Sequence, residues 1–137
     1  MVTLIGMGSG SWEALSVQAQ DAVRLLAGLP PECTARQFAL YQPAEILETL
    51  AQAPGQDAAV LYSGDTGFYS GASGLLTPLR ALGIPARVYP GVSSIQLLAA
   101  ALGRPWQDWK LVSAHGCACD PVAECMTERS VFFLTGG

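Results

Sequence analysis

Short apolar runs alternate along the chain with longer segments in which apolar residues recur every three or four positions. A run of four or five apolar residues without polar alternation is typical of a strand covered on both faces, as in a parallel sheet. A spacing of three or four is typical of a helix with one buried face. The pattern therefore predicts alternating strands and helices. The predicted strands are residues 2–5, 58–62, 86–89, 110–113 and 130–135.

Four helices are predicted between and before these strands. Ser16 and Ser93 stand where a hydroxyl would cap a helix N-terminus, and Ser93 is followed three residues later by a glutamine, which has the form of a capping box. Gly83 and Gly103 are suited to end the third and fourth helices, and Pro78 is predicted to kink or split the third. The apolar faces are Leu15, Ala19, Val23 and Leu26; Ile46, Leu47 and Leu50; Leu75, Leu76, Leu79 and Leu82; and Ile95, Leu98, Ala99 and Leu102.

This alternation predicts the α/β class, as a three-layer sandwich with a mostly parallel sheet, because parallel neighbours are joined by helical crossovers. At 137 residues the chain has the length of one domain. The last predicted strand is followed by two glycines only. We therefore expect residues 1–137 to be the N-terminal domain of a longer protein, with the second domain absent.

The charge pattern limits the classes of partner. Seven Lys and Arg stand against eleven Asp and Glu, and the basic residues are scattered singly. A surface that follows nucleic-acid phosphates is not predicted. No apolar run approaches the ~20 residues of a membrane span, and the N-terminus has no basic leader. We expect a cytoplasmic protein with neither a nucleic-acid nor a membrane partner.

Three turns rich in small residues follow predicted strands, at residues 6–11, 63–68 and 90–94. Because the carboxyl ends of parallel strands meet at one edge of a sheet, these turns are expected to converge. Glycines allow the backbone to approach a ligand closely, and Asp65 is the only acid in the three turns. The sequence predicts a trough for a small neutral or cationic molecule with hydroxyl and amine groups. The alternative for Asp65 is that it only stabilises its own turn.

Other chemistry has weaker signals. The glycine spacing at residues 6–10 is only part of a dinucleotide-binding fingerprint, because Ser11 and then Trp12 replace its continuation. No Ser-His-Asp arrangement or pair of carboxylates supports hydrolysis through a covalent intermediate. One further cluster combines soft ligands with a spacing unlike familiar zinc patterns, so reduced thiols in a loop are predicted rather than a metal site. That cluster is His115, Cys117, Cys119 and Cys125.

The three turns, in this order, resemble the motifs of the tetrapyrrole (corrin/porphyrin) methylase family. The family has G-x-G-P-G-[DS], [SG]-G-D-P and P-G-[VI]-[ST]-[SA], and this chain has GMGSGS, SGDTGFYSG and PGVSS. Residues 67–116, which end in Ser-Ala-His-Gly, look most like the branch that acts on precorrin-6Y as a decarboxylating C5,15-methyltransferase. Ser9 and Thr66 stand where the family usually has proline, and we expect these changes to loosen both turns.

The resemblance implies an S-adenosylmethionine-dependent enzyme that methylates carbon atoms of a precorrin in cobalamin biosynthesis, working as a homodimer. It implies no identified catalytic base, although His115, the only imidazole, is a candidate. By motif matching, the cofactor contacts would be Ser9, Ser63, Gly64, Asp65, Phe68, Ser93 and Ser94. The macrocycle contacts would be Gly6, Gly8, Gly10 and His115.

Without a second domain to close the cleft, we expect this chain alone to bind the cofactor weakly, if at all, and to show no appreciable turnover. Two alternatives stay open at this point. One is a methylase of ribosomal RNA or of a modified translation factor within the same fold family. The other is a non-catalytic domain for ligand binding or dimerisation.

Overall fold

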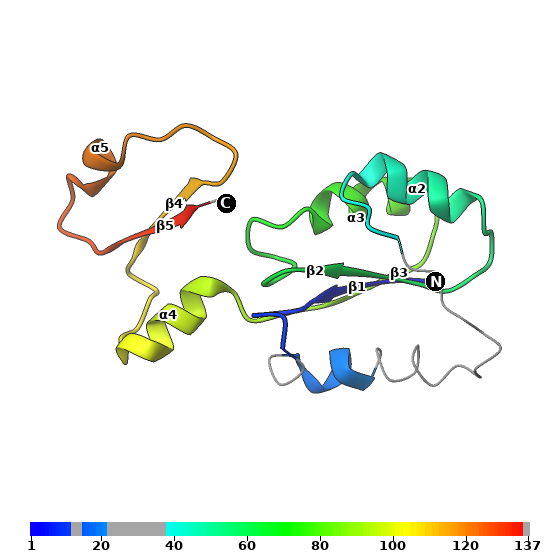
Figure 1. The fold of residues 1–137 in the computed structure, drawn as a ribbon, viewed down its shortest axis with the longest axis horizontal. Coiled ribbons are helices and arrows are strands. Elements are labelled where there is room, and N and C mark those ends of the chain that lie inside the picture. Colours follow the sequence, from blue (N-terminus) through cyan, green and yellow to red (C-terminus); the bar gives the residue numbers. More distant parts are fainter. Residues whose placement is uncertain (12–14, 22–37, 136–137) are drawn as a thin grey trace. The chain divides into compact units, whose positions relative to one another are not determined.

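The computed structural model describes residues 1–11, 15–21 and 38–135. The chain forms two units, Met1–Ser93 and Ser94–Gly137, which are described in turn (Figure 1). Val23, Leu26 and the predicted stop of the first helix lie outside the described residues, as does Cys33.

The first unit is built on three parallel strands in the order β2-β1-β3. They are β1 (Val2–Gly6), β2 (Ala58–Tyr62) and β3 (Ala86–Tyr89), and Val2 of β1 lies opposite both Ala58 and Ala86. These strands confirm the predictions for residues 2–5, 58–62 and 86–89. Because all three run in the same direction, their carboxyl ends lie along one edge of the sheet.

Two helices cover one face of this sheet, α2 (Pro43–Ala51) and α3 (Ala72–Ala81) (Figure 1). Leu4 of β1 packs in a cluster with Ile46 of α2 and with buried leucines of α3. Burying each such side chain contributes about 1.5–3 kcal/mol relative to leaving it exposed. The predicted apolar faces of the second and third helices therefore meet the sheet as expected, with the exception of Leu82.

The opposite face is covered over its centre by the helical residues 17–21 (Figure 1). Ile5 of β1 packs there with Leu15 and Ala19. The Ala19 amide donates a hydrogen bond to Ser16 Oγ at 3.2 Å, which confirms Ser16 as the N-cap. The first unit thus has helices on both sides of a parallel sheet.

The prediction that residues 58–62 are buried on both faces is wrong. Val60 and Tyr62 are partly covered, whereas Ala59 is exposed and Leu61 keeps 56% of its surface exposed. In the described residues β2 is an edge strand, and the cluster on the second face centres on β1. An apolar run therefore marks a central position for β1 but not for β2.

Helix α3 ends as predicted but is not split. The Gly83 amide donates to the Arg80 carbonyl at 3.0 Å and the Ile84 amide to the Leu79 carbonyl at 2.9 Å, with Gly83 at φ +66°. This is the bonding of a Schellman end. The helix continues through Pro78 to Ala81. Leu79, directly after the proline, is fully buried in the core. Leu82, at the helix end, is 64% exposed and does not join the apolar face.

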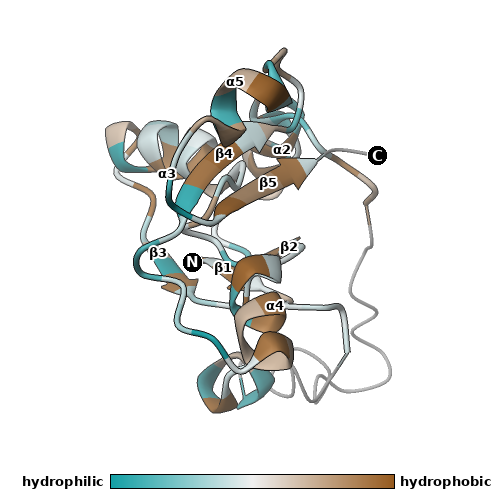
Figure 2. Cartoon of the chain, turned by 90° about the vertical axis from the view of Figure 1, so that its left-hand side faces the viewer, coloured by the Kyte–Doolittle hydropathy of each residue, from teal (hydrophilic) through white to brown (hydrophobic). Residues whose placement is uncertain are grey.

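The second unit contains α4 (Ser94–Leu102), β4 (Lys110–Ala114), α5 (Pro121–Cys125) and β5 (Val131–Thr135). Strands β4 and β5 pair in parallel, with Lys110 opposite Val131, and Figure 2 shows β5 as predominantly hydrophobic. The described strands therefore pair as two parallel sheets, one in each unit. The α/β class with parallel pairing is confirmed.

Helix α4 begins at Ser94, so Ser93 occupies the predicted capping position. Its buried stripe is one row wide: Ile95 and Ala99 are buried, whereas Leu98 and Leu102 are 42% and 53% exposed. The prediction that these two leucines lie on the buried face is wrong, because they fall beside that row.

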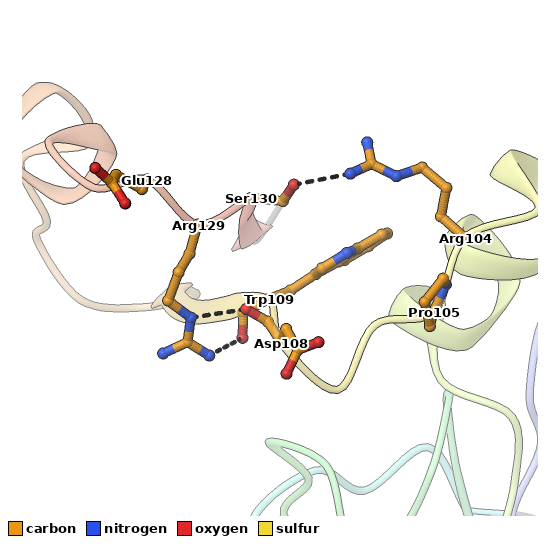
Figure 3. Close-up of a pocket in the computed structure, with 7 residues that line it drawn as sticks. All are labelled: Arg104, Pro105, Asp108, Trp109, Glu128, Arg129 and Ser130. Atoms are coloured by element: carbon orange, nitrogen blue, oxygen red, sulfur yellow. Dashed lines mark hydrogen bonds between the residues drawn. The ribbon is translucent and has the colours of Figure 1, made fainter.

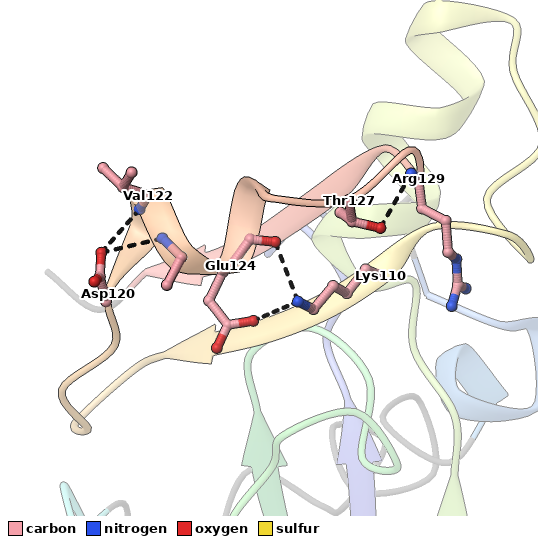
Figure 4. A network of polar contacts seen from close by, with 7 residues as sticks. Lys110, Asp120, Val122, Glu124, Thr127 and Arg129 are labelled. Carbon is pink, nitrogen blue, oxygen red and sulfur yellow. Dashed lines mark hydrogen bonds and ion pairs between the residues drawn. The ribbon is translucent and has the colours of Figure 1, made fainter.

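Helix α5 was not predicted and begins at a side-chain cap. Asp120 Oδ1 accepts hydrogen bonds from the amides of Val122 and Ala123 at 3.0 and 3.2 Å (Figure 4). Lys110 of β4 pairs with Glu124 Oε2 at 2.7 Å and donates to the Glu124 carbonyl at 3.1 Å. A pair this exposed contributes about 1 kcal/mol or less, so it orients α5 more than it stabilises the unit.

Within the described segments, no helix combines the length and the apolar character needed to cross a membrane.

A first prediction concerns pH. Burial raises the pKa of the Tyr62 phenol above its ordinary value of about 10, because a buried phenolate is poorly solvated. Below pH ~10 the phenol is protonated in both states, and above it only the unfolded state releases the proton readily. The free energy of unfolding should therefore fall as pH rises from about 10 through the raised pKa.

Tyr62→Phe should remove this part of the fall, which denaturant titrations at a series of pH values would measure. Tyr41→Phe is the matched control, because that ring is 87% exposed. The same slope in wild type and Tyr62→Phe would contradict the prediction.

Candidate functional site

The first two turns are joined by backbone hydrogen bonds beyond the ends of their strands. The Met7 amide donates to the Tyr62 carbonyl at 2.7 Å. Gly8 and Gly64 then exchange two hydrogen bonds, at 3.0 and 2.9 Å. Both of these glycines have positive φ, 58° and 69°, which residues with a Cβ adopt only at a cost. Glycine at these two positions therefore permits the junction.

The third turn packs directly against the first two. A Cβ built on Gly6 would lie 2.5 Å from the Gly91 nitrogen, and a Cβ on Gly91 would overlap the Gly64 carbonyl oxygen. The three turns thus meet backbone to backbone at the carboxyl edge of the sheet. The predicted convergence is confirmed for residues 6–11, 63–68 and 90–93, which we call the loop cluster.

Asp65 holds the second turn together. Its Oδ1 accepts a hydrogen bond from the Gly67 amide at 2.8 Å, which is the turn-stabilising role that the sequence left open. The side chain is only partly buried, and Oδ2 has no partner among the described residues. The carboxylate can therefore support the turn with one oxygen and offer the other to a ligand.

Thr66 is a link that the sequence analysis missed. Its hydroxyl lies 3.4 Å from both the Tyr89 carbonyl and Asp65 Oδ1 and can donate to one at a time. The residue is 9% exposed. The expected loosening of the turn stays a prediction, and the hydroxyl adds a link from the second turn to β3 that a proline could not make. The sequence signal for this link was a threonine in a turn expected to pack against its neighbours, because a buried hydroxyl needs a hydrogen-bond partner.

The other predicted site residues differ in exposure. Ser9, Gly10 and Ser63 are exposed on the loop cluster, and Phe68 is partly buried in an edge-to-face contact with Tyr69, 4.9 Å between ring centres. Gly6 and Gly8 are buried, and so is Ser93, at 4% exposure. In the second unit, Ser94 starts α4 and His115 directly follows β4, and both are exposed.

The predicted cysteine loop holds free thiols. Cys117, Cys119 and Cys125 form no disulfide, and the Cys117 thiol donates to the Ser113 carbonyl at 3.0 Å. In residues 1–11, 15–21 and 38–135, no three His, Cys, Asp or Glu side chains are grouped closely enough to hold a metal ion.

A groove of about 300 Å³ lies in the second unit, where the chain enters β4 and β5 (Figure 3). Arg129 bridges the carbonyls of Asp108 and Trp109 at 2.7 and 3.2 Å, and Arg104 reaches Ser130 Oγ at 3.4 Å. Two acids balance the two arginines, so the groove has no net charge to select an ion. No motif in the sequence marks this groove. Its lining is Arg104, Pro105, Asp108, Trp109, Glu128, Arg129 and Ser130.

Residues 1–132 match the family described as Tetrapyrrole (Corrin/Porphyrin) Methylases. The chain belongs to this family, as the motifs of the three turns predicted. The curated relatives are precorrin methyltransferases. The precorrin-4 C(11)-methyltransferase of Rhodococcus erythropolis is 32% identical over 75% of this chain and 48% of its own length. The cobalt-precorrin-7 C(5)-methyltransferase of Salmonella typhimurium is 30% identical over 98% of this chain and 71% of its own length.

The chain thus spans about half the length of the precorrin-4 relatives that it matches. Solved structures agree on the fold. A cobalt precorrin-4 methyltransferase superposes with a TM-score of 0.68 at 20% identity, over 88% of this chain and 60% of that one. A precorrin-6Y methylase from Archaeoglobus fulgidus superposes with a TM-score of 0.64 at 20% identity, over 98% and 72%. The tetrapyrrole methylase fold is therefore shown.

A second prediction tests the backbone contacts of the loop cluster. Gly91→Ala should lower the free energy of unfolding by about 1–3 kcal/mol, because its methyl group would overlap the Gly64 carbonyl. Gly74→Ala is the matched control: its Cβ would make an ordinary 3.5 Å contact with Pro43. Inside α3, that change should stabilise by up to about 1 kcal/mol. Chemical denaturation measures both, and a Gly91→Ala protein as stable as wild type would show that the close approach is absent.

Proposed function

We propose that residues 1–137 are the N-terminal domain of an S-adenosylmethionine-dependent methyltransferase that acts on a precorrin in cobalamin biosynthesis. The observation that carries the proposal is the loop cluster: three turns with the family's motifs converge at the ligand-binding edge of a parallel sheet. The lengths of the relatives support a longer parent enzyme, because the matched region makes up only about half of each precorrin-4 relative. We further propose that the parent protein is cytoplasmic and works as a homodimer.

The exposed polar groups of the loop cluster fit S-adenosylmethionine, the methyl donor. S-adenosylmethionine carries an amine, a carboxylate, ribose hydroxyls and a sulfonium charge. Exposed hydroxyls at Ser9 and Ser63 and the second oxygen of Asp65 are suited to the hydroxyls and the positive charges, and the glycine backbone leaves room for close approach. We assign Gly64, Phe68, Ser93 and Ser94 to the same cofactor site by their motif positions.

When bound, the donor supplies an activated methyl group. The residues of this chain would contribute alignment and exclusion of water rather than a covalent intermediate. Among the proposed macrocycle contacts, Gly10 and His115 are exposed, whereas Gly6 and Gly8 are buried in the loop cluster and would act through its shape. No residue is assigned as a catalytic base, and His115 stays the candidate.

The proposed substrate is of the precorrin-6Y type, methylated at C5 and C15. Support comes from coverage: the C(5)-methyltransferase relative matches 98% of this chain, and so does the precorrin-6Y methylase structure. A second candidate is methylation of precorrin-4 at C11, which is favoured by the 34% identity to the Pseudomonas aeruginosa enzyme over 74% of the chain. A methyl-transfer assay that offers both precorrins to the full-length protein separates the two.

The two other hypotheses have less support. Methylation of ribosomal RNA or a translation factor is disfavoured by the scattered basic residues and by relatives named for precorrins. A non-catalytic binding domain predicts ligand binding without transfer in the full-length protein, which the same assay detects.

A third prediction concerns this chain by itself. It should bind S-adenosylmethionine only in the millimolar range and show no turnover, because small-molecule sites bury most of their ligand and the loop cluster supplies one side of a site. Calorimetric titration gives the upper limit of affinity, and saturation-transfer NMR detects the weak complex. Micromolar affinity would contradict the half-site argument, and absence of saturation transfer in the full-length protein would contradict the proposed function.

A fourth prediction isolates the charge of Asp65. Asp65→Asn keeps an oxygen for the Gly67 amide but removes the charge, so affinity for S-adenosylmethionine should fall roughly tenfold or more with little change in stability. Asp65→Ala should also lose about 1 kcal/mol of stability with the turn. Asp57→Asn is the control for net charge, because Asp57 precedes β2 at the opposite edge of the sheet. Saturation-transfer NMR compares the three, and equal losses in Asp57→Asn and Asp65→Asn would refute a local role.

A further inference from the structure

Tyr69 has an unusual backbone for a residue with a large side chain. Its φ is +47°, and it is the only residue other than glycine with positive φ in the described part of the chain. Residues with a Cβ adopt this left-handed conformation rarely, and a bulky residue there stores backbone strain. A glycine or asparagine would relieve the strain.

Within the described residues, neither burial nor a hydrogen bond of the Tyr69 side chain offsets this strain; only the bonds of the neighbouring turn residues hold the backbone in place. The side chain is 51% exposed, so core burial does not fix it. The phenol has no hydrogen-bond partner there, and the ring contact is with its neighbour Phe68, at 4.9 Å and an interplanar angle of 83°. The edge-to-face contact orients the Tyr69 ring but leaves much of its surface open.

The position of Tyr69 points to a ligand. It follows Asp65 by four residues, in the turn that continues from the carboxyl end of β2. Residues 63–68 of that turn belong to the loop cluster, which carries the family's motifs, and Tyr69 directly follows them. Backbone strain that is held by surrounding bonds clusters at active sites and ligand-binding sites.

We propose that Tyr69 is a ligand-contact residue whose exposed ring packs against a planar conjugated ring of the bound ligand. The inference rests on the proposed function, which offers two such rings: the adenine of the methyl donor and the tetrapyrrole macrocycle. Offset or edge contacts between aromatic rings are favourable and directional. The left-handed backbone presents the ring, and Phe68 sets its orientation.

The experiment uses the whole chain and three probes: S-adenosylmethionine, adenosine, and uroporphyrin as a soluble tetrapyrrole. Binding is measured by saturation-transfer NMR for wild type, Tyr69→Phe, Tyr69→Gly and Tyr69→Asn. Tyr41→Ala is the control, because it removes an exposed tyrosine ring outside the loop cluster. Thermal unfolding of each variant is recorded alongside.

Tyr69→Phe keeps the ring and should bind as wild type does. Tyr69→Gly and Tyr69→Asn should lose about three- to tenfold in affinity, with melting temperatures no lower than that of wild type because the strain is relieved. Loss for adenosine and S-adenosylmethionine identifies the adenine as the partner, and loss for uroporphyrin alone identifies the macrocycle.

Unchanged affinity for all three probes in Tyr69→Gly and Tyr69→Asn overturns this inference and leaves the proposed function standing. A lower melting temperature in both variants with unchanged binding assigns Tyr69 a structural role and also overturns it. If wild type binds none of the probes, the same variants are compared in the full-length protein, and absence of binding there means that the proposed function itself has failed.

Discussion

The close approach of Gly6, Gly64 and Gly91 is the contact on which the rest of the first unit depends. A methyl group at the first or last of these positions would meet backbone atoms of another turn. The carboxyl ends of β1, β2 and β3 can therefore bring their turns together only if Gly6 and Gly91 lack side chains. The mutual hydrogen bonds of Gly8 and Gly64 then hold the first two turns in register. The candidate site is a consequence of this backbone packing.

The second turn combines support and exposure in a few residues. Asp65 bonds the Gly67 amide, and Thr66 reaches the carbonyl of Tyr89 on the neighbouring strand. Two residues after Gly67, Tyr69 has a strained backbone and a side chain that is about half exposed to solvent. A turn fixed at its base can hold an exposed ring in an unfavourable backbone conformation, because the neighbouring bonds prevent relaxation. Stability of this turn and affinity for a ligand are thus expected to oppose each other.

Prediction from the pattern succeeded where local rules act alone and failed where neighbours decide. Ser16 caps its helix and Gly83 ends α3, because capping geometry involves residues only a few positions apart. Leu61 and Leu98 were expected to be buried and are exposed. Burial depends on which elements cover a strand or a helix, and this is not encoded in the residue's own surroundings in the chain. Helix α5 was missed because its five residues are too few for a helical period.

The sequence by itself determined the strands, the helices other than α5, the family and the three turns that share one edge, because each follows from short-range periodicity and from glycine motifs at strand ends. Only the tertiary structure decided that, of the strands in the described ranges, β1 alone is covered on both faces and that Thr66 ties the second turn to β3. It also decided that Gly6 and Gly8 are buried in backbone contacts rather than open to solvent. These features depend on contacts between residues far apart in the chain, which no local pattern specifies.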